Sequence, residues 1–181
     1  MHRKPAGINK SSQAGTTLAE VLVVMILLVI LVVVAVPSWK SYTERQHLKG
    51  AAQALMSDLT LMRSEAVAKN STVTIRFQTG ATWCYGLSDN PAQTCSCQPG
   101  GTGCTLNGVQ KVNSWANFKN VQLVSTTFTN QTTGFEPVRG MAVSGGTVVF
   151  QSTSGQQVRV ELNPVGRIRG CASQLPPFSP C

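Results

Sequence analysis

The sequence predicts an α+β protein in which a long N-terminal helix packs on an antiparallel β-sheet domain. Three observations lead to this prediction. An apolar run covers residues 18–36, apolar residues then recur at helical spacing as far as Ala66, and alternation of apolar and polar residues begins near residue 72 and returns in later segments. The length of 181 residues allows one domain with an extension.

The chain begins with a basic leader over residues 1–15, which contains three cations and no acid. The apolar run LAEVLVVMILLVILVVVAV follows and is interrupted only by Glu20. Because a membrane-spanning helix needs about 20 apolar residues, we expect residues 16–37 to form a transmembrane helix half with the N-terminus in the cytoplasm. The run is longer than the apolar region of a secretory signal peptide, and no small-x-small cleavage site follows it directly.

Glu20 is the unusual residue of this apolar segment, since it lies only five residues into it counting from Thr16. A carboxylate inside a membrane helix costs about 2.5–3.5 kcal/mol on insertion scales, so such a residue is usually paired and functional. The alternative is that the side chain of Glu20 simply reaches the lipid headgroups. A plain membrane anchor does not explain why an acid stands at this position.

Residues 38–70 are predicted to continue as an amphipathic helix half. One apolar stripe runs along it with spacings of three and four residues. Its members are Leu48, Ala52, Leu55, Leu59, Met62 and Ala66. We expect this stripe to pack on a sheet and Asn70-Ser71 to end the helix. Pro37, between the two halves, lacks a backbone donor and predicts a kink or a local melt.

Residues 71–181 are predicted to form a β-rich globular domain with a cysteine-rich insert over residues 84–104. The predicted strands are Thr72–Gln78, Trp83–Leu87, Val121–Phe128, Thr147–Gln151, Gln157–Leu162 and Val165–Arg169. Glycine-rich breaks separate them, and a long loop, Ser88–Ser114, holds three of the cysteines. A loop of this length in a small domain indicates an insert tied by disulfides.

The six cysteines are Cys84, Cys95, Cys97, Cys104, Cys171 and Cys181. An even number in an exported chain indicates disulfides, but the number of possible pairings is large and the connectivity stays open. A metal site at Cys95, Cys97 and Cys104 is the alternative. Cys-x-Cys is not the usual zinc spacing, however, and no histidine lies nearby. Free thiols are the third possibility.

The stretch Gly15-Thr16-Thr17-Leu18-Ala19-Glu20 and the apolar run after it resemble the signal of type IV prepilins and of type II secretion pseudopilins. The resemblance implies that prepilin peptidase cleaves after Gly15 and methylates the new amino terminus on Thr16, although the first mature residue of this family is usually Phe. It also implies that Glu20 pairs with the methylated amine of a neighbouring pilin subunit. Such a chain starts as a single-pass protein of the inner membrane and ends in the periplasm and in a pilus at the cell surface.

A second resemblance lies near the C-terminus. The Gly-Arg-x-Arg sequence of residues 166–169 is similar to an element of the GspH/FimT group of minor pilins and pseudopilins. In the FimT branch of that group, the arginines of this element bind DNA during natural transformation. The resemblance therefore implies that Arg167 and Arg169, together with Gly166, bind DNA.

The residues themselves support the same hypothesis. In a strand, residues two apart point the same way and lie about 6.6 Å apart. That separation is comparable to the spacing of successive phosphates along a strand of DNA, on the order of 7 Å. Two guanidinium groups on one face can therefore grip adjacent phosphates, while Gly166 and Gly170 leave the backbone open to close approach. The alternative is that the arginines are only solvated, or pair with Glu136 or Glu161.

The charge of the chain favours a polyanionic partner without establishing one. The net charge is +8, and three of the fifteen cations lie in the leader, so residues 16–181 carry twelve cations against seven acids, a net of +5. Further cations that can widen the arginine patch are Lys111, Lys119, Arg139 and Arg159. A bridge between Cys171 and Cys181 would hold the C-terminal tail beside the arginines.

The sequence argues against an enzyme, and no cofactor is expected. The mature chain has one histidine, His47, no nucleophile motif accompanied by a base, and no phosphate-binding glycine loop. Three hypotheses remain: a minor type IV pilin that binds DNA for uptake, a structural minor pilin that primes pilus assembly, and a pseudopilin of a type II secretion system. Only the strand that carries Arg167 and Arg169 favours the first.

Overall fold

The computed structural model describes residue 15, residues 17–90 and residues 92–181, without the side chains of residues 34–38. The chain forms two compact units, Met1–Trp39 and Lys40–Cys181, which we describe separately. Leader residues 1–14 and Thr16, where the sequence predicts methylation, lie outside the described residues. Gly15, the predicted cleavage position, is exposed.

The first unit contains the beginning of helix α1 (Leu18–Lys69). Thr17 caps it, because its Oγ1 accepts a hydrogen bond from the backbone N–H of Glu20 at 3.3 Å. The described large apolar side chains are exposed here, between 48% at Val21 and 84% at Leu18. Across the residues that the structure describes, no helix combines the length and the apolar character needed to cross a membrane.

Helix α1 continues without a break through residue 37, so the local melt predicted at Pro37 is wrong. A proline removes a single backbone donor, and the turns on either side keep the rest of the hydrogen-bond ladder. The helix ends as the sequence predicts. Asn70 adopts a left-handed φ of 50°, and the N–H of Ser71 returns to the carbonyl of Ala66 at 3.2 Å, the geometry of a Schellman cap.

The second unit is built on the apolar stripe of α1, and all six stripe residues are at most 1% exposed. The strands form two four-stranded antiparallel sheets and a small hairpin. Sheet A has the order β5 (Val112–Ser114), β2 (Cys84–Ser88), β1 (Val73–Gln78) and β7 (Thr132–Phe135). Sheet B has the order β10 (Ile168–Ala172), β9 (Gln157–Leu162), β8 (Gly146–Ser152) and β6 (Val121–Thr126). The hairpin pairs β3 (Thr105–Leu106) with β4 (Val109–Gln110).

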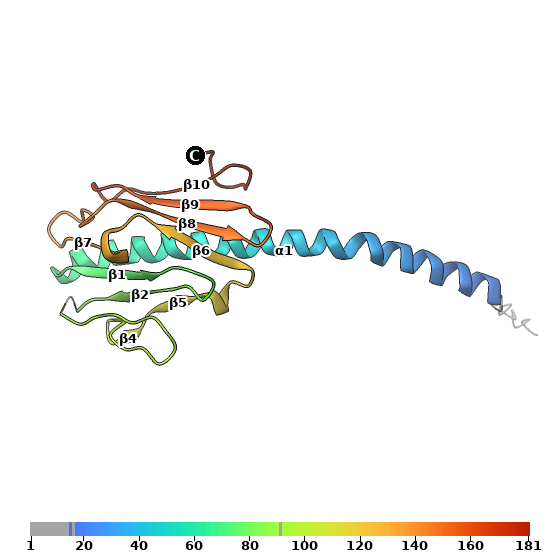
Figure 1. The fold of residues 1–181 in the computed structure, drawn as a ribbon, viewed down its shortest axis with the longest axis horizontal. Helices are drawn as coiled ribbons and strands as arrows, with labels where there is room; N and C mark the ends of the chain where they lie inside the picture. The colour runs from blue at the N-terminus through green and yellow to red at the C-terminus, as the bar shows by residue number, and fades with distance from the viewer. Residues whose placement is uncertain (1–14, 16, 91) are drawn as a thin grey trace, which may run out of the picture. The chain divides into compact units, whose positions relative to one another are not determined.

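Both sheets lie along the C-terminal part of α1, as Figure 1 shows. Two 3₁₀ turns, η1 (Trp115–Asn117) and η2 (Thr129–Gln131), flank β6. The predicted α+β class, with a helix packed on antiparallel sheets, is confirmed. Aromatic side chains join the two sheets in the core: Trp83 lies 5.2 Å from Phe150 between ring centroids, and Phe77 stacks on Phe128 at 5.5 Å.

The predicted strands differ from the observed ones mainly at two places. The last strand was expected over Val165–Arg169, but β10 begins at Ile168, because residues 164–166 form a tight turn. Strand β7 (Thr132–Phe135) and the three short strands β3, β4 and β5 were not predicted. Segments of two to four residues carry too little alternation to be recognised, and their pairing depends on neighbours that folding brings to them.

The cysteines form three disulfides: Cys84–Cys97, Cys95–Cys104 and Cys171–Cys181. The prediction of disulfides is confirmed, and the alternative of a metal site is wrong, since the sulfur atoms of Cys95, Cys97 and Cys104 are all held in disulfides. Two of the bridges lie in the insert. A Cβ atom at Gly86 would lie 2.6 Å from the sulfur of Cys95, so only glycine lets this bridge pack on β2.

Candidate nucleic-acid interface

Strands β9 and β10 are joined by a three-residue loop, Pro164–Gly166, which we call the hairpin loop. The N–H of Gly166 donates to the carbonyl of Asn163 at 2.8 Å, and the N–H of Asn163 donates to the carbonyl of Arg167 at 3.0 Å. Gly166 has a left-handed φ of 85°. This is the three-residue hairpin geometry whose last loop position favours glycine. The glycine of the Gly-Arg-x-Arg sequence therefore builds the turn that presents the first arginine.

The predicted role of Gly166 and Gly170, to leave the backbone open to a ligand, needs correction. Gly166 is buried, and a Cβ atom there would lie 2.6 Å from the carbonyl oxygen of Gly140. A Cβ atom at Gly170 would lie 2.7 Å from the ring of Phe178 and 2.8 Å from the sulfur of Met56. Both glycines are needed for close packing inside the protein, and neither offers a surface to a partner.

Arg167 and Arg169 are both exposed. Arg169 lies on β10 opposite Glu161 of β9, and the carbonyl of Arg167, just before β10, accepts the N–H of Asn163. Since Arg167 precedes the strand, the predicted pair of arginines on one strand face stays a prediction. The expected alternative, an ion pair with Glu136 or Glu161, is not formed among the described residues.

The C-terminal tail lies beside the second arginine. The Cys171–Cys181 disulfide closes it, and the N–H of Ala172 donates to the carbonyl of Ser179 at 2.9 Å. Arg169 donates from Nη2 to the carbonyl of Pro180 at 3.4 Å, while the Arg167 guanidinium has no partner in the described part of the chain. The tail thus covers the edge of β10 beyond Arg169 and leaves the end at Arg167 open.

Arg63 of α1 joins the site, although no sequence pattern pointed to it. Its Nη1 donates to the carbonyl of Gly166 at 3.2 Å. A Cβ atom at Gly140 would lie 3.0 Å from Nε of Arg63, and the N–H of Ala142 donates to the carbonyl of Pro164 at 3.0 Å. The turn before Ala142, the hairpin loop and the last turns of α1 therefore meet. A helical arginine off the apolar stripe is expected to be solvated, which is why this contact could not be anticipated.

The four further cations that the sequence could not place lie in different regions. Arg139 precedes Gly140 and so borders the hairpin loop, and Arg159 lies on β9 opposite Cys171. Lys119 precedes β6, whose Val121 pairs with Ser152 at the other end of sheet B. Lys111 forms an ion pair of 3.4 Å with Asp58. Only Arg139 and Arg159 can widen the arginine patch.

Asp58 belongs to a buried polar network between α1 and sheet A. Its Oδ2 accepts hydrogen bonds from the Tyr85 hydroxyl at 2.9 Å and from Nδ2 of Asn113 at 2.8 Å, and the side chain is 8% exposed. Burial, followed by the negative charge of Asp58, raises the pKa of Tyr85 well above its usual value. Every member of the network has a partner, so it holds the helix on the sheet and offers no reactive group.

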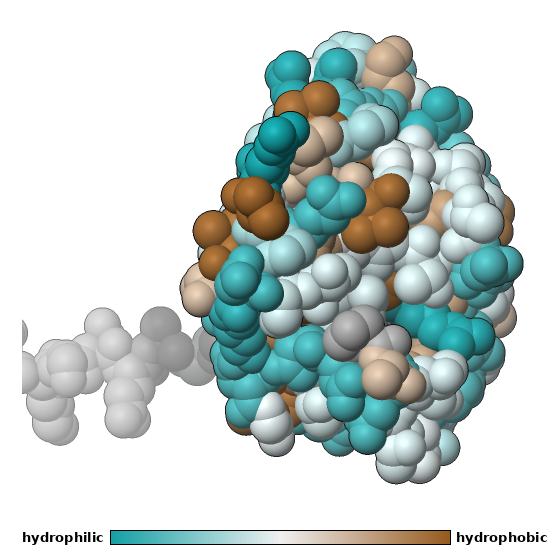
Figure 2. Space-filling model, turned by 90° about the vertical axis from the view of Figure 1, so that its left-hand side faces the viewer, coloured by the Kyte–Doolittle hydropathy of each residue, from teal (hydrophilic) through white to brown (hydrophobic). Residues whose placement is uncertain are grey.

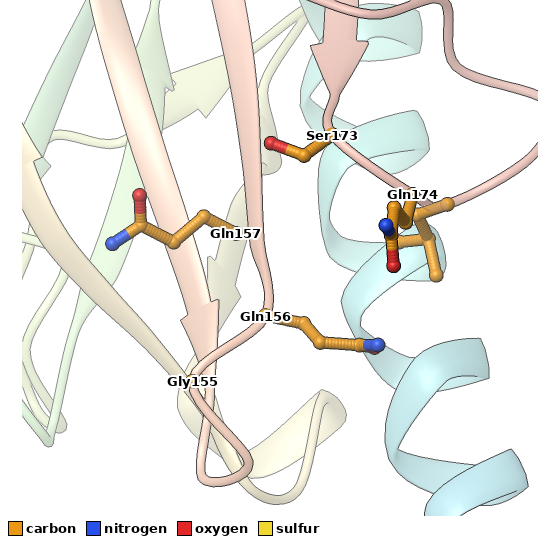
Figure 3. A pocket seen from close by; sticks show the side chains of 6 residues that line it. Gly155, Gln156, Gln157, Ser173 and Gln174 are labelled. Atoms are coloured by element: carbon orange, nitrogen blue, oxygen red, sulfur yellow. The ribbon is translucent and has the colours of Figure 1, made fainter.

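A polar pocket lies between the β8–β9 turn and the C-terminal tail (Figure 3). It is lined by Gly155, Gln156, Gln157, Ser173, Gln174 and Leu175. The Oε1 atom of Gln156 is buried there without a hydrogen-bond partner in the described structure. None of these side chains titrates in the physiological range, so the pocket has no group for acid–base chemistry. The described residues likewise contain no group of three or more side chains able to hold a metal ion.

Figure 2 faces the left-hand end of the molecule in Figure 1, where the β9–β10 hairpin turns. Hydrophobic side chains occur on this end as separate spots among hydrophilic ones, not as one continuous patch. The exposed apolar residues near the hairpin include Val138 at 81% and Val165 at 70%. Charged and apolar groups are thus interspersed around the arginines.

Comparison with known proteins identifies the family. The sequence model of the family described as "Type II transport protein GspH" matches residues 51–166, more than half of the chain, and ends just before Arg167. Among solved structures, the chain resembles the type IV minor pilin FimU of Pseudomonas aeruginosa, with 19% identity, a TM-score of 0.50, and coverage of 75% of this chain and 92% of that one.

It also resembles the minor pseudopilin EpsH from the type 2 secretion system of Vibrio cholerae, with 16% identity, a TM-score of 0.48, and coverage of 70% of this chain and 97% of that one. At such identities the likeness concerns the fold alone. No curated protein matches the chain. The match to the family model, on a helix packed against antiparallel sheets as in a minor pilin, shows that the chain belongs to the GspH family and has a pilin-like fold.

Proposed function

We propose that this protein is a minor type IV pilin that binds DNA without sequence preference through Arg167 and Arg169 and supports DNA uptake in natural transformation. The observation that carries the proposal is the hairpin, which holds two exposed arginines two residues apart. Neither arginine is neutralised by an acid among the described residues. A cation without an acidic partner keeps its charge available for an external anion.

The chemistry of recognition follows from the guanidinium group. Its planar donors match a phosphate and can bind it through two parallel hydrogen bonds. Two aromatic rings lie beside the arginines: Phe135, next to Gly166, is buried, and Phe178, which packs over Gly170, is partly buried, so neither offers an open face for stacking on a base. Contacts to phosphates alone carry no sequence information, and binding should therefore be independent of base sequence.

We also propose that the protein is assembled as the signal at its N-terminus indicates. Prepilin peptidase cleaves after Gly15 and methylates Thr16, and Glu20 then pairs with the amine of a neighbouring pilin subunit. Residues 16–37 hold the subunit in the inner membrane before assembly into a pilus. Support comes from the sequence of the run and from the exposed apolar side chains between Leu18 and Val33. The proposal contains no catalytic step and no cofactor.

Processing can be tested by mass spectrometry of the protein recovered from cells that contain prepilin peptidase. The expected amino terminus is a methylated Thr16. Replacement of Gly15 by a bulky residue should leave the leader in place. An amino terminus elsewhere in the wild-type protein would contradict the proposed processing.

DNA binding can be tested by gel-shift titration of the oxidised full chain in a nonionic detergent, with a short duplex at low and at physiological salt. We expect binding that weakens steeply with salt, because phosphate contacts release counterions. The Arg167→Ala/Arg169→Ala variant should lose it. Binding that persists unchanged in this variant would falsify the assignment of the site.

A second candidate function is supported by the exposed valines near the hairpin. Val138 and Val165 are 81% and 70% exposed, and apolar side chains in such positions suit contact with another subunit. The protein would then be a structural minor pilin, or a pseudopilin of a type II secretion system. Absence of DNA binding at low salt, together with loss of filament assembly in a Val138→Ser/Val165→Ser variant, would favour this candidate.

A further inference from the structure

Two more arginines meet at the hairpin loop, and they come from parts of the chain far from it in sequence. Arg63 donates to the carbonyl of Gly166, the residue before Arg167. It also packs against Gly140, the residue after Arg139. A Cβ atom on Gly140 would lie 3.0 Å from Nε of Arg63. The Arg63 side chain therefore touches the immediate neighbours of both other arginines.

Gly140 and Gly166, the chain neighbours of Arg139 and Arg167, are in direct contact. The carbonyl oxygen of Gly140 lies 2.6 Å from the position of a Cβ atom on Gly166. Since consecutive Cα atoms are about 3.8 Å apart, the Cα atoms of Arg139 and Arg167 are separated by a distance on the order of 10 Å. Arginine side chains are long enough for guanidinium groups on such backbones to reach neighbouring phosphates of one strand.

The charge around the hairpin loop is not balanced within the described structure. Arg139 and Arg167 form no ion pair there, and Arg63, an exposed residue, uses Nη1 for the Gly166 carbonyl. The only acid in the adjoining turn is Glu136, whose carbonyl, not its carboxylate, accepts the N–H of Gly140. Around the hairpin loop three cations thus lie near this one acid of the adjoining turn.

The other direction along β10 is closed to a polyanion. The disulfide-bonded tail covers the strand beyond Arg169, through the Ala172–Ser179 hydrogen bond. Glu161 also lies directly opposite Arg169 on β9 and repels phosphates. Arg159 also lies on this side, opposite Cys171, so the arginines that a polyanion reaches without meeting the tail lie from Arg169 toward the hairpin loop.

We infer that the phosphate backbone of bound DNA runs from Arg169 over Arg167 and continues across the hairpin loop onto Arg139 and Arg63. The inference rests on the proposed DNA binding and defines the path of the strand on the protein. Arg63 has two tasks in it: it fixes the hairpin loop through the Gly166 carbonyl, and it places its remaining donors along the path.

The experiment measures DNA affinity of the full chain in a nonionic detergent by fluorescence anisotropy, with a labelled short duplex, over a series of salt concentrations. Each phosphate contact contributes about 0.9 to the slope of log affinity against log salt for duplex DNA. Arg139→Ala and Arg63→Gln should each lower the magnitude of the slope by about 0.9, the contribution of one phosphate contact. Arg63→Lys, which keeps the charge, should retain the wild-type slope.

Lys119→Ala serves as the matched control, because Lys119 is an exposed cation at the opposite end of sheet B. It should keep the wild-type slope. Slopes that stay at the wild-type value in Arg139→Ala and Arg63→Gln, while Arg167→Ala/Arg169→Ala lowers it, would overturn the extended path and leave the two-arginine site intact. A reduced slope in Arg63→Lys would overturn the direct contact of Arg63, and a wild-type protein that does not bind at low salt would overturn both proposals.

Discussion

The cations on the α1–sheet A side and those at the hairpin end of sheet B differ in whether they form ion pairs. Lys69 lies 2.6 Å from Asp89 and 3.8 Å from Glu65, and Lys111 lies 3.4 Å from Asp58. The arginines of the hairpin end, by contrast, form no ion pair within the described residues. The cations of the first group are ion-paired inside the protein, and those of the second have no acidic partner there. Net charge alone does not distinguish the two.

The α1–sheet A side also shows how an ion pair shifts the pKa of an acid. The hydrogen bond from Lys69 is the first cause that lowers the pKa of Asp89, and the backbone N–H of Asn107 adds to it. Because the folded pKa lies below the unfolded value, the stabilising effect of this carboxylate is present above the unfolded pKa and is lost as the pH falls through the folded one. The carboxylate is exposed, so the contribution is small.

The largest effect is expected at the hairpin end of sheet B, whose arginines form no ion pair in the described structure. Arg167→Ala/Arg169→Ala should weaken DNA binding by on the order of a hundredfold at low salt, because two charge-assisted contacts worth roughly 1.5–3 kcal/mol each are lost. Thermal stability should stay near the wild-type value, since neither guanidinium forms an ion pair in the described structure. Gel shifts and melting curves measure the two effects.

Lys69→Ala is the matched control for that comparison, because it removes an ion-paired cation from the same protein. It should leave DNA binding unchanged and lower stability only slightly, as expected of an exposed ion pair. Equal losses of DNA affinity in the lysine and arginine variants would show that total charge decides binding, and would remove the distinction between the two sides.

The next effect concerns stability on the sheet A side. Cys95→Ser/Cys104→Ser opens a bridge with a sequence separation of 9 and should lower the free energy of unfolding by about 2–3 kcal/mol, because the unfolded chain gains freedom. DNA binding should be retained, since the hairpin lies in the other sheet. Chemical denaturation under oxidising conditions measures the first effect. A loss of DNA affinity in the folded variant would contradict a site confined to the hairpin end.

A smaller effect is expected at high pH from the buried network of Tyr85 and Asp58. The unfolded chain releases the tyrosine proton near pH 10, whereas burial and Asp58 keep it on the folded chain to a higher pH. The free energy of unfolding should therefore fall as the pH rises above about 10. Tyr85→Phe should reduce this fall. Identical pH profiles from denaturant melts would refute the assignment.

The smallest effect is predicted for Glu161→Gln on β9. Removing the acid opposite Arg169 should raise DNA affinity by about twofold at low salt, because a nearby exposed charge is largely screened. The gain should vanish at physiological salt. Glu65→Gln on the ion-paired side is the control and should not change DNA affinity. A gain of equal size in both variants would point to a general charge effect.

Much of the fold could be anticipated because its signals are local. The apolar stripe from Leu48 to Ala66 repeats over five turns, and the alternating residues of β9 were predicted with the observed bounds. Short strands such as β7 were not predicted, since their pairing partners are distant in the sequence. The interface was anticipated only in part: Arg167 and Arg169 follow from a motif, whereas Arg63 reaches the site through a contact separated by 103 residues.

The sequence by itself determined the class of fold, the helical stripe, the use of the cysteines in disulfides and the spacing of the two arginines. These follow from periodicity, composition and spacing, which act over a few residues. Only the tertiary structure decided which cysteines pair, that Asp58 is buried with Tyr85, that Gly166 closes a turn rather than opening a surface, and that Arg63 and Arg139 border the hairpin loop. Those outcomes depend on how α1 and the two sheets pack, and packing joins residues that no local pattern connects.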